Sequence, residues 1–302
     1  RTLELKPHTR KHFSTIQFSS DFNPTAKCLK FNTFLKDVLV KYDAGKYVPD
    51  KELLNLVIEF MGYCLVPEIT HHKALFLYGE GRNGKSVLVW ILEQMFKNYV
   101  SHVDLDTLGY NTFATSSLVG KLLNVSAEVS VDTTVKDSIF KAVVAGDRIR
   151  VEEKYKNAFD FSSVAKHIIT ANNLPKSKDS SLGFYERFYI VPFHRIFLNK
   201  RKLEEMVPRE GNKVKLMNPR LKEELKKEIP GIFNLAIQGL IHLRKNGEFT
   251  ECEQTEVFLR RFKLRNQSVD IFIKEKLEYD AEKKTLLAEC RKSYVEFCKE
   301  SR

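Results

Sequence analysis

The segment Gly79–Ser86 (GEGRNGKS) places a lysine and a serine behind closely spaced glycines, at the spacing of a phosphate-binding loop. An apolar run at 74–78 precedes it and another at 87–92 follows it, as a strand and a helix would. Glycines let backbone N–H groups turn toward a phosphate, and the positive end of the following helix favours an anion. Lys85 is expected to reach the β- and γ-phosphates of ATP, and the Ser86 hydroxyl to bind Mg²⁺. The predicted ATP-binding residues are Gly79, Glu80, Gly81, Arg82, Asn83, Gly84, Lys85, Ser86 and Val87.

A carboxylate follows the second apolar run of this region, 121–127, at Glu128. A phosphate-loop enzyme needs an acid to hold Mg²⁺ or to polarise the attacking water. A strand that delivers this acid at its carboxyl end would be the Walker B strand, so Glu128 is predicted to be catalytic and, with Ser86, a metal ligand. An exposed acid at a strand end is the alternative.

Two further polar side chains stand at the ends of apolar segments. Asn172 follows the segment 165–170 and is a candidate partner of the attacking water or the γ-phosphate, although an Asx turn before Pro175 is an equal alternative. Arg187 comes directly before the segment 188–192. Its planar, permanently charged guanidinium suits the charge on a transferring phosphoryl group, whereas a surface ion pair is the alternative.

Two short alternating segments between 145 and 161 flank Lys154, Tyr155 and Lys156, which predicts a β-hairpin with these residues at its tip. Lysines neutralise phosphates and an aromatic ring stacks on bases, so the tip is a candidate DNA-binding element. A solvated hairpin tip is the alternative.

The composition of the 302-residue chain, with 43% hydrophobic and 29% charged residues, is that of a globular protein. The net charge of +11 makes nucleic acid the first candidate partner, with a merely basic surface as the alternative. The five cysteines form no CxxC pair and are typical of reduced thiols inside a cell. No apolar run approaches the roughly 18 residues that a membrane helix needs, so no membrane partner is expected.

The pattern along the chain predicts three regions. Residues 1–70 show helical periodicity, with Gly45 and Pro49 between two helices. Residues 71–200 alternate apolar runs with helical patterns, which predicts an α/β core with a sheet covered by helices. A charge-rich connector at 199–228 leads into the third region, 201–302, which continues as helix. The predicted strands are 75–78, 122–127, 165–170 and 188–192, and a predicted helix at 134–144 stops at Gly146.

The order of these segments resembles the superfamily 3 helicases, most closely the helicase part of phage, plasmid and poxvirus primase-helicases. The resemblance covers about residues 30–300. It is carried by the segments GEGRNGKS, LLNVSAE, AGDRIRVEEKYKNAFDF, HIITANNLP and ERFYIVPF, with supporting segments at 59–65 and 231–240.

This resemblance implies an AAA+-like P-loop ATPase core that assembles as a hexameric ring and moves on single-stranded or forked DNA. It makes Glu128 the Walker B acid, Asn172 a sensor of the bound nucleotide, and Arg187 an arginine finger acting on a neighbouring subunit's ATP. Lys154 and Lys156 would touch DNA in the ring channel. A primase-polymerase domain in the same polypeptide, and a location in the host cytoplasm where a phage, plasmid or virus replicates, are further implications.

Two positions depart from the family pattern. Ala127 stands where many relatives carry a second acid, and Glu186 stands where many carry a second arginine. Arg148 or Arg195 is a candidate for the missing second sensor. An ATP-dependent initiator or clamp that does not unwind DNA stays open as an alternative function. A small-molecule kinase is disfavoured by the hairpin and by the basic charge.

Overall fold

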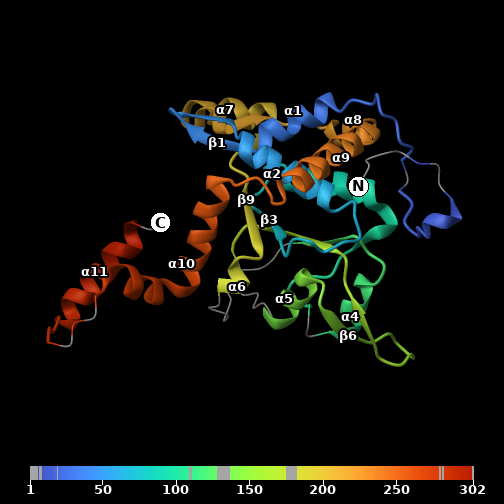
Figure 1. Ribbon diagram of the computed structural model, residues 1–302. Helices are drawn as coiled ribbons and strands as arrows, with labels where there is room; N and C mark the ends of the chain where they lie inside the picture. Colours follow the sequence, from blue (N-terminus) through green and yellow to red (C-terminus); the bar gives the residue numbers. More distant parts are fainter. Residues whose placement is uncertain are drawn as a thin grey trace.

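A parallel sheet of five strands forms the centre of the structure, a computed structural model that describes residues 6, 9–18, 20–108, 111–127, 137–174, 182–278, 280 and 282–300 (Figure 1). All its pairings are parallel. In spatial order the strands are β4 (Val100–Ser101), β5 (Leu123–Ser126), β8 (Lys166–Ala171), β3 (Ala74–Tyr78) and β9 (Phe188–Pro192). The four longer strands agree with the predicted ones to within one residue, which confirms the α/β class with a parallel sheet. The fifth strand, β4, is too short to leave a signal in the sequence.

Helices cover both faces of this sheet, as the side chains of β3 show. Leu75 and Leu77 belong to one buried apolar cluster, whereas Ala74 and Phe76 belong to another. Because successive residues of a strand point to opposite faces, the two clusters fill opposite sides of the sheet. The first cluster lies beneath α1 (Leu29–Val38), α2 (Lys51–Tyr63), α3 (Lys85–Phe96), α8 (Leu221–Lys226) and α9 (Ile229–Asn246). The second lies beneath α5 (Asp137–Ala145), α6 (Leu182–Tyr185) and the first part of α10 (Glu253–Lys276).

The helices α2 and α9 cross at unusually close range. A Cβ added at Gly62 would lie 2.3 Å from the carbonyl oxygen of Ala236, and one added at Gly239 would lie 2.3 Å from that of Ile58. Beside the crossing, the buried carboxylate of Glu59 accepts hydrogen bonds from Thr250, whose backbone nitrogen lies 2.7 Å and whose hydroxyl lies 2.6 Å away. The N-terminal helices and the helices after the sheet therefore form one packed layer.

Two segments differ from their prediction. The region 1–70 is not helical throughout, because β1 (Val40–Asp43) and β2 (Lys46–Pro49) form an antiparallel hairpin between α1 and α2. Its turn contains Gly45 at φ 83°, a conformation that glycine adopts without steric cost. The two-strand signal is short, and only the turn residues mark it in the sequence.

The charge-rich connector at 199–228 is also folded. It contains α7 (Lys200–Glu210), the strand β11 (Val214–Leu216) and α8. The strand β11 pairs in parallel with β10 (Ile196–Leu198). No residue of α7 is buried, so its charged composition gives no core-facing pattern from which to predict it.

The C-terminal region is helical, as expected. The helix α10 bends at Gln267, where φ is −140° and ψ is 33°. Beyond the bend it packs against α11 (Leu287–Glu300) around the small cluster of Leu264, Phe272 and Phe297. Figure 1 shows this pair extending away from the sheet. None of the helices in the described ranges is long and apolar enough to cross a membrane.

Short elements complete the chain. The predicted helix at 134–144 corresponds to α5, which is followed by Gly146 at φ 73°; residues 134–136 lie outside the described residues. The predicted domain boundaries at 70 and 200 stay predictions.

The remaining elements of the described residues are α4 (Thr112–Thr115), β6 (Arg148–Val151), β7 (Phe159–Ser162) and the 3-10 helices Arg10–His12, Lys97–Tyr99, Ser116–Leu118 and Gly211–Lys213.

Candidate nucleotide-binding site

The loop between β3 and α3 has the backbone that a phosphate-binding loop requires. Gly79 has φ 149° and Gly84, the N-cap of α3, has φ 96°. A Cβ at Gly79 would lie 2.6 Å from the carbonyl oxygen of Phe193, and one at Gly84 would lie 2.7 Å from a methyl carbon of Val38. A side chain fits at neither position, so these two glycines are needed for the turn itself. Arg82 also has a positive φ, 62°, and its carbonyl oxygen accepts a 2.8 Å hydrogen bond from the backbone of Phe197.

Lys85 lies at the start of α3 and is buried, with 7% of its surface exposed. Its ammonium donates hydrogen bonds to the carbonyl oxygens of Gly79 and Glu80 and to Oδ1 of Asn172, which lies 3.2 Å away. Asn172 follows β8, and β8 pairs directly with β3. Parallel strands end at the same edge of a sheet, and this edge brings together the two residues that the sequence predicts for the γ-phosphate.

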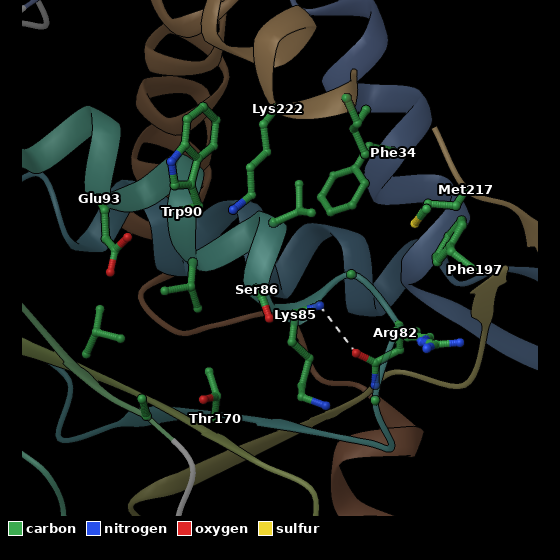
Figure 2. Close-up of a pocket in the computed structure, with 18 of the residues that line it drawn as sticks. Phe34, Arg82, Lys85, Ser86, Trp90, Glu93, Thr170, Phe197, Met217 and Lys222 are labelled. Atoms are coloured by element: carbon green, nitrogen blue, oxygen red, sulfur yellow. Dashed lines mark hydrogen bonds between the residues drawn. The ribbon is translucent and has the colours of Figure 1, made fainter. Parts of the chain in front are cut away.

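A cavity of about 840 Å³ opens over this loop. Ser86 is exposed on its wall, opposite Thr170, as Figure 2 shows. The predicted loop residues from Gly81 to Val87 line the cavity, and so does Asn172, whereas Gly79 and Glu80 lie on the other side of the loop, in a smaller cavity of about 190 Å³. The volume of the larger cavity, about 840 Å³, is within the range of small-molecule sites in proteins.

The remaining walls of the cavity come from segments that the sequence does not single out. An apolar part is made by Phe34 of α1, Phe197 of β10 and Met217 after β11, while Trp90 and Glu93 extend along α3 (Figure 2). Trp90 and Glu93 have a sequence signal, because they lie four and seven residues after Ser86 and therefore on the same face of the helix. The others come from distant parts of the chain and depend on the tertiary fold.

The predicted acid Glu128 lies outside the described residues. The residue before it, Ala127, lines the cavity together with Val125 of β5. The strand β5 pairs with β8, so the end of the predicted Walker B strand lies beside the end of the strand that carries Asn172.

Arg187 lies at the amino ends of the strands, at the end of the sheet opposite the phosphate-binding loop. It precedes β9, whose first residue is level with Ala74, five residues before Gly79 along β3. Arg187 is therefore six positions from Gly79, and at about 3.3 Å a residue it is about 20 Å from the loop within one chain. Its guanidinium donates to the carbonyl oxygens of Gly183 and Lys141, the latter at 3.4 Å. One chain therefore does not bring Arg187 to its own cavity.

The hairpin predicted between 145 and 161 is confirmed: β6 and β7 pair antiparallel from Arg148 opposite Ser162 to Val151 opposite Phe159. At its tip, Tyr155 is fully exposed and has φ 63°. The ammonium of Lys156 pairs with the carboxylate of Glu153. Figure 1 shows the tip projecting from the lower edge of the molecule. Its binding to DNA stays a prediction.

The two candidates for a second sensor are both away from the cavity walls. Arg195 is buried, 6% exposed, and its guanidinium lies 2.9 Å from the carbonyl oxygen of Tyr47 and 3.5 Å from the carboxylate of Asp37. Arg148 is exposed on β6. Arg195 is thus held by structural contacts with α1 and β2.

A buried polar group lies beneath the site, between β5 and β8. The amide nitrogen of Asn124 is 3.4 Å from Nδ1 of His167, and the amide oxygen of Asn124 accepts from Ser101 and from the backbone of Val103. Nδ1 of His167 is therefore the acceptor, and Nε2, which has no hydrogen-bond partner among the described residues, carries the proton. Burial, with the charge of Lys166 beside it, lowers the pKa of His167 to about 4. Burial also lowers the pKa of Lys166, to about 8.

Comparisons with known proteins relate part of the chain to viral proteins that are named as putative helicases. Residues 77–187 match a family described as a family of unknown function (DUF5906). An Acanthamoeba polyphaga mimivirus protein named "Putative helicase L207/L206" is 23% identical over 173 residues, 55% of this chain and 18% of that protein. A Sputnik virophage protein named "Putative helicase V13" is 22% identical over 262 residues, 78% of this chain and 32% of that protein. The chain spans less than a third of the length of either relative.

Solved structures of the NrS-1 C-terminal region share the fold. The A-form apo structure has a TM-score of 0.53 at 18% identity and covers 79% of this chain and 53% of that one. The apo structure of NrS-1 residues 305–718 has a TM-score of 0.52 at 16% identity and covers 92% of this chain and 64% of that one. The chain is thus a distant relative of viral proteins named as helicases, with a mixed α/β fold that is already known.

Proposed function

We propose that this chain is the ATPase part of a viral, phage or plasmid DNA helicase of the superfamily 3 type, with a P-loop AAA+-like core. The observation that carries the proposal is the meeting of Lys85 and Asn172 over a glycine loop, at the carboxyl edge of a parallel sheet. The names of the two viral relatives support the same function.

The residues of the loop fit ATP and Mg²⁺. The loop from Gly81 to Val87 lines the cavity, so its backbone is available to the phosphates. In this proposal Lys85 exchanges its contacts with loop carbonyl oxygens for phosphate oxygens. Ser86, whose hydroxyl is exposed in the cavity, holds Mg²⁺, which neutralises developing charge on the phosphates.

The remaining catalytic roles follow from where the side chains lie. Asn172, 3.2 Å from Lys85, positions the γ-phosphate or the attacking water, and Glu128 polarises that water. Arg187 is too far from the loop of its own chain, so it acts on the nucleotide of a neighbouring copy. A residue supplied in this way makes hydrolysis depend on assembly, here as a hexameric ring.

DNA contacts are assigned to the tip of the β6–β7 hairpin. Lys154 and Tyr155 are exposed there, and Lys156 pairs with the nearby Glu153. The lysines bind phosphates and the tyrosine stacks against a base or sugar. Movement of this hairpin with the state of the nucleotide would pull a strand of DNA.

The proposal is tested by ATP hydrolysis with and without single-stranded DNA, together with the mass of the protein in solution. A large oligomer whose turnover is stimulated by DNA is expected. ATP turnover that is indifferent to DNA would contradict the helicase assignment. If turnover responds to DNA but a forked substrate is not separated, the alternative of an initiator or clamp replaces it.

A further inference from the structure

A lysine from the charged segment after the sheet points into the same cavity. Lys222 of α8 lines it together with Lys85 and Ser86, and its ammonium lies 5.3 Å from the centre of the Trp90 ring. Figure 2 shows its side chain descending between Trp90 and Phe34 toward Ser86. Within the described residues, no carboxylate forms an ion pair with Lys222 at 4.0 Å or less.

The helix that carries Lys222 is joined to α1. The ammonium of Lys30 lies 2.8 Å from the carboxylate of Glu224. The carboxylate of Glu228, the N-cap residue of α9 two positions after α8, accepts from the backbone nitrogens of Lys30 and Phe31 at 3.1 and 2.9 Å, and so caps the first turn of α1. Because α1 carries Phe34, the helices α1 and α8 together form a roof over the cavity.

We propose that Lys222 is a second cation for the phosphates of the bound nucleotide, supplied by the same chain that supplies Lys85. This inference rests on the proposed nucleotide site. An ammonium that points into a site for a polyanion and has no carboxylate partner gains more electrostatic stabilisation from the bound anion than an ammonium that is already paired. The indole of Trp90 holds this ammonium near the loop by a cation–π contact.

A contact between Lys222 and the nucleotide would also couple the position of α8 and α1 to nucleotide binding. A phosphate bound by Lys222 draws α8 toward α3, and Glu224 and Glu228 transmit this displacement to the start of α1. Trp90, the only tryptophan of the chain, reports the event because it touches Lys222. We expect its fluorescence to change when nucleotide binds.

The test measures the Kd of adenosine 5′-(β,γ-imido)triphosphate with Mg²⁺ by calorimetry. Lys222→Gln is expected to raise the Kd about tenfold at low salt, the size of one charge-assisted hydrogen bond. The difference from the wild type shrinks as salt is added, because the lost contact is electrostatic. Lys222→Arg keeps the charge and restores most of the affinity. Lys226→Gln, on the same helix but outside the cavity wall, is the matched control.

The outcomes separate this inference from the proposed function. Equal Kd values for Lys222→Gln and Lys226→Gln, with binding abolished by Lys85→Ala, would overturn the role of Lys222 and leave the nucleotide site intact. A wild-type chain that binds no nucleotide would overturn both. An equal loss of affinity at all salt concentrations, or a lower melting temperature for Lys222→Gln alone, would assign Lys222 a structural role and overturn the proposal.

Discussion

Lys85 and Asn172 are joined by a 3.2 Å hydrogen bond, although 87 positions separate them in the sequence. In the proposed mechanism this pair opens when the phosphates enter, and each side chain then serves the γ-phosphate. Asn172→Ala should lower kcat for ATP about a hundredfold with a smaller change in KM, because its contact strengthens in the transition state. Lys85→Ala should abolish turnover. The exposed neighbour Asn173 provides the control, and an equal loss in Asn173→Ala would contradict the assignment of Asn172.

His167 predicts a dependence of stability on pH. Its pKa is about 4 in the folded protein and 6.5 as the ordinary value, so the folded state holds His167 neutral where the unfolded chain already binds a proton. Above pH 6.5 His167 is neutral in both states and does not lower the free energy of unfolding. As the pH falls from 6.5 toward 4, proton binding to the unfolded chain lowers the free energy of unfolding by up to about 3 kcal/mol. Urea unfolding at pH 7.5 and 4.5 measures it.

The variant His167→Gln is the control for this prediction. Its free energy of unfolding should fall less than that of the wild type between the two pH values. Lys166 interferes little, because even its lowered pKa of about 8 lies above both pH values and leaves it mostly protonated. Parallel curves for the two proteins would show that another group is responsible.

At the scale of elements, the crossing of α2 and α9 is the contact most sensitive to a single methyl group. The carbonyl group of Ala236 faces Gly62, and that of Ile58 faces Gly239. Both belong to helical backbone, so displacing them costs free energy. Gly62→Ala and Gly239→Ala should each lower the free energy of unfolding by roughly 2–3 kcal/mol. Gly81→Ala, with open space at its Cβ, should leave it unchanged. Chemical denaturation of the nucleotide-free chain decides between these outcomes.

The β6–β7 hairpin makes a prediction about DNA. If Lys154 and Lys156 contact phosphates, the affinity for single-stranded DNA falls with salt, and removing each lysine lowers the log–log slope by about 0.7. Fluorescence anisotropy of a labelled oligonucleotide at several salt concentrations gives the slope. A slope that is the same in the double alanine variant would assign the lysines to a solvated tip.

The elements also show how far the sequence leads. The loop Gly79–Ser86, the long strands and the hairpin were predictable because their residues stand in continuous local patterns. The cavity walls were not: Phe34, Phe197 and Lys222 come from three separate segments and meet only through packing. The charged composition of 199–228 predicts a connector because α7 buries none of its residues, and the role of this segment in the roof depends on contacts with α1 and α3.

At the scale of the whole molecule, the sheet separates the two halves of the proposed catalytic site. The strand β9, which follows Arg187, is one edge of the sheet, and β4 is the other. The cavity extends toward β5, beside β4, where Val125 and Ala127 line it. A second copy that presents its β9 edge to this side would bring an arginine to the nucleotide, which one chain alone does not do.

This arrangement predicts complementation between two inactive chains. Arg187→Ala keeps its own phosphate loop, and Lys85→Ala keeps its arginine. In an equal mixture, about a quarter of the junctions pair an intact loop with an intact arginine, so about a quarter of the wild-type turnover should return. ATP hydrolysis is measured for each variant alone and after mixing, with subunit exchange verified by mass. If mixed assemblies form and stay inactive, Arg187 does not act across the junction, and its hydrogen bonds to Gly183 and Lys141 would then be its whole role.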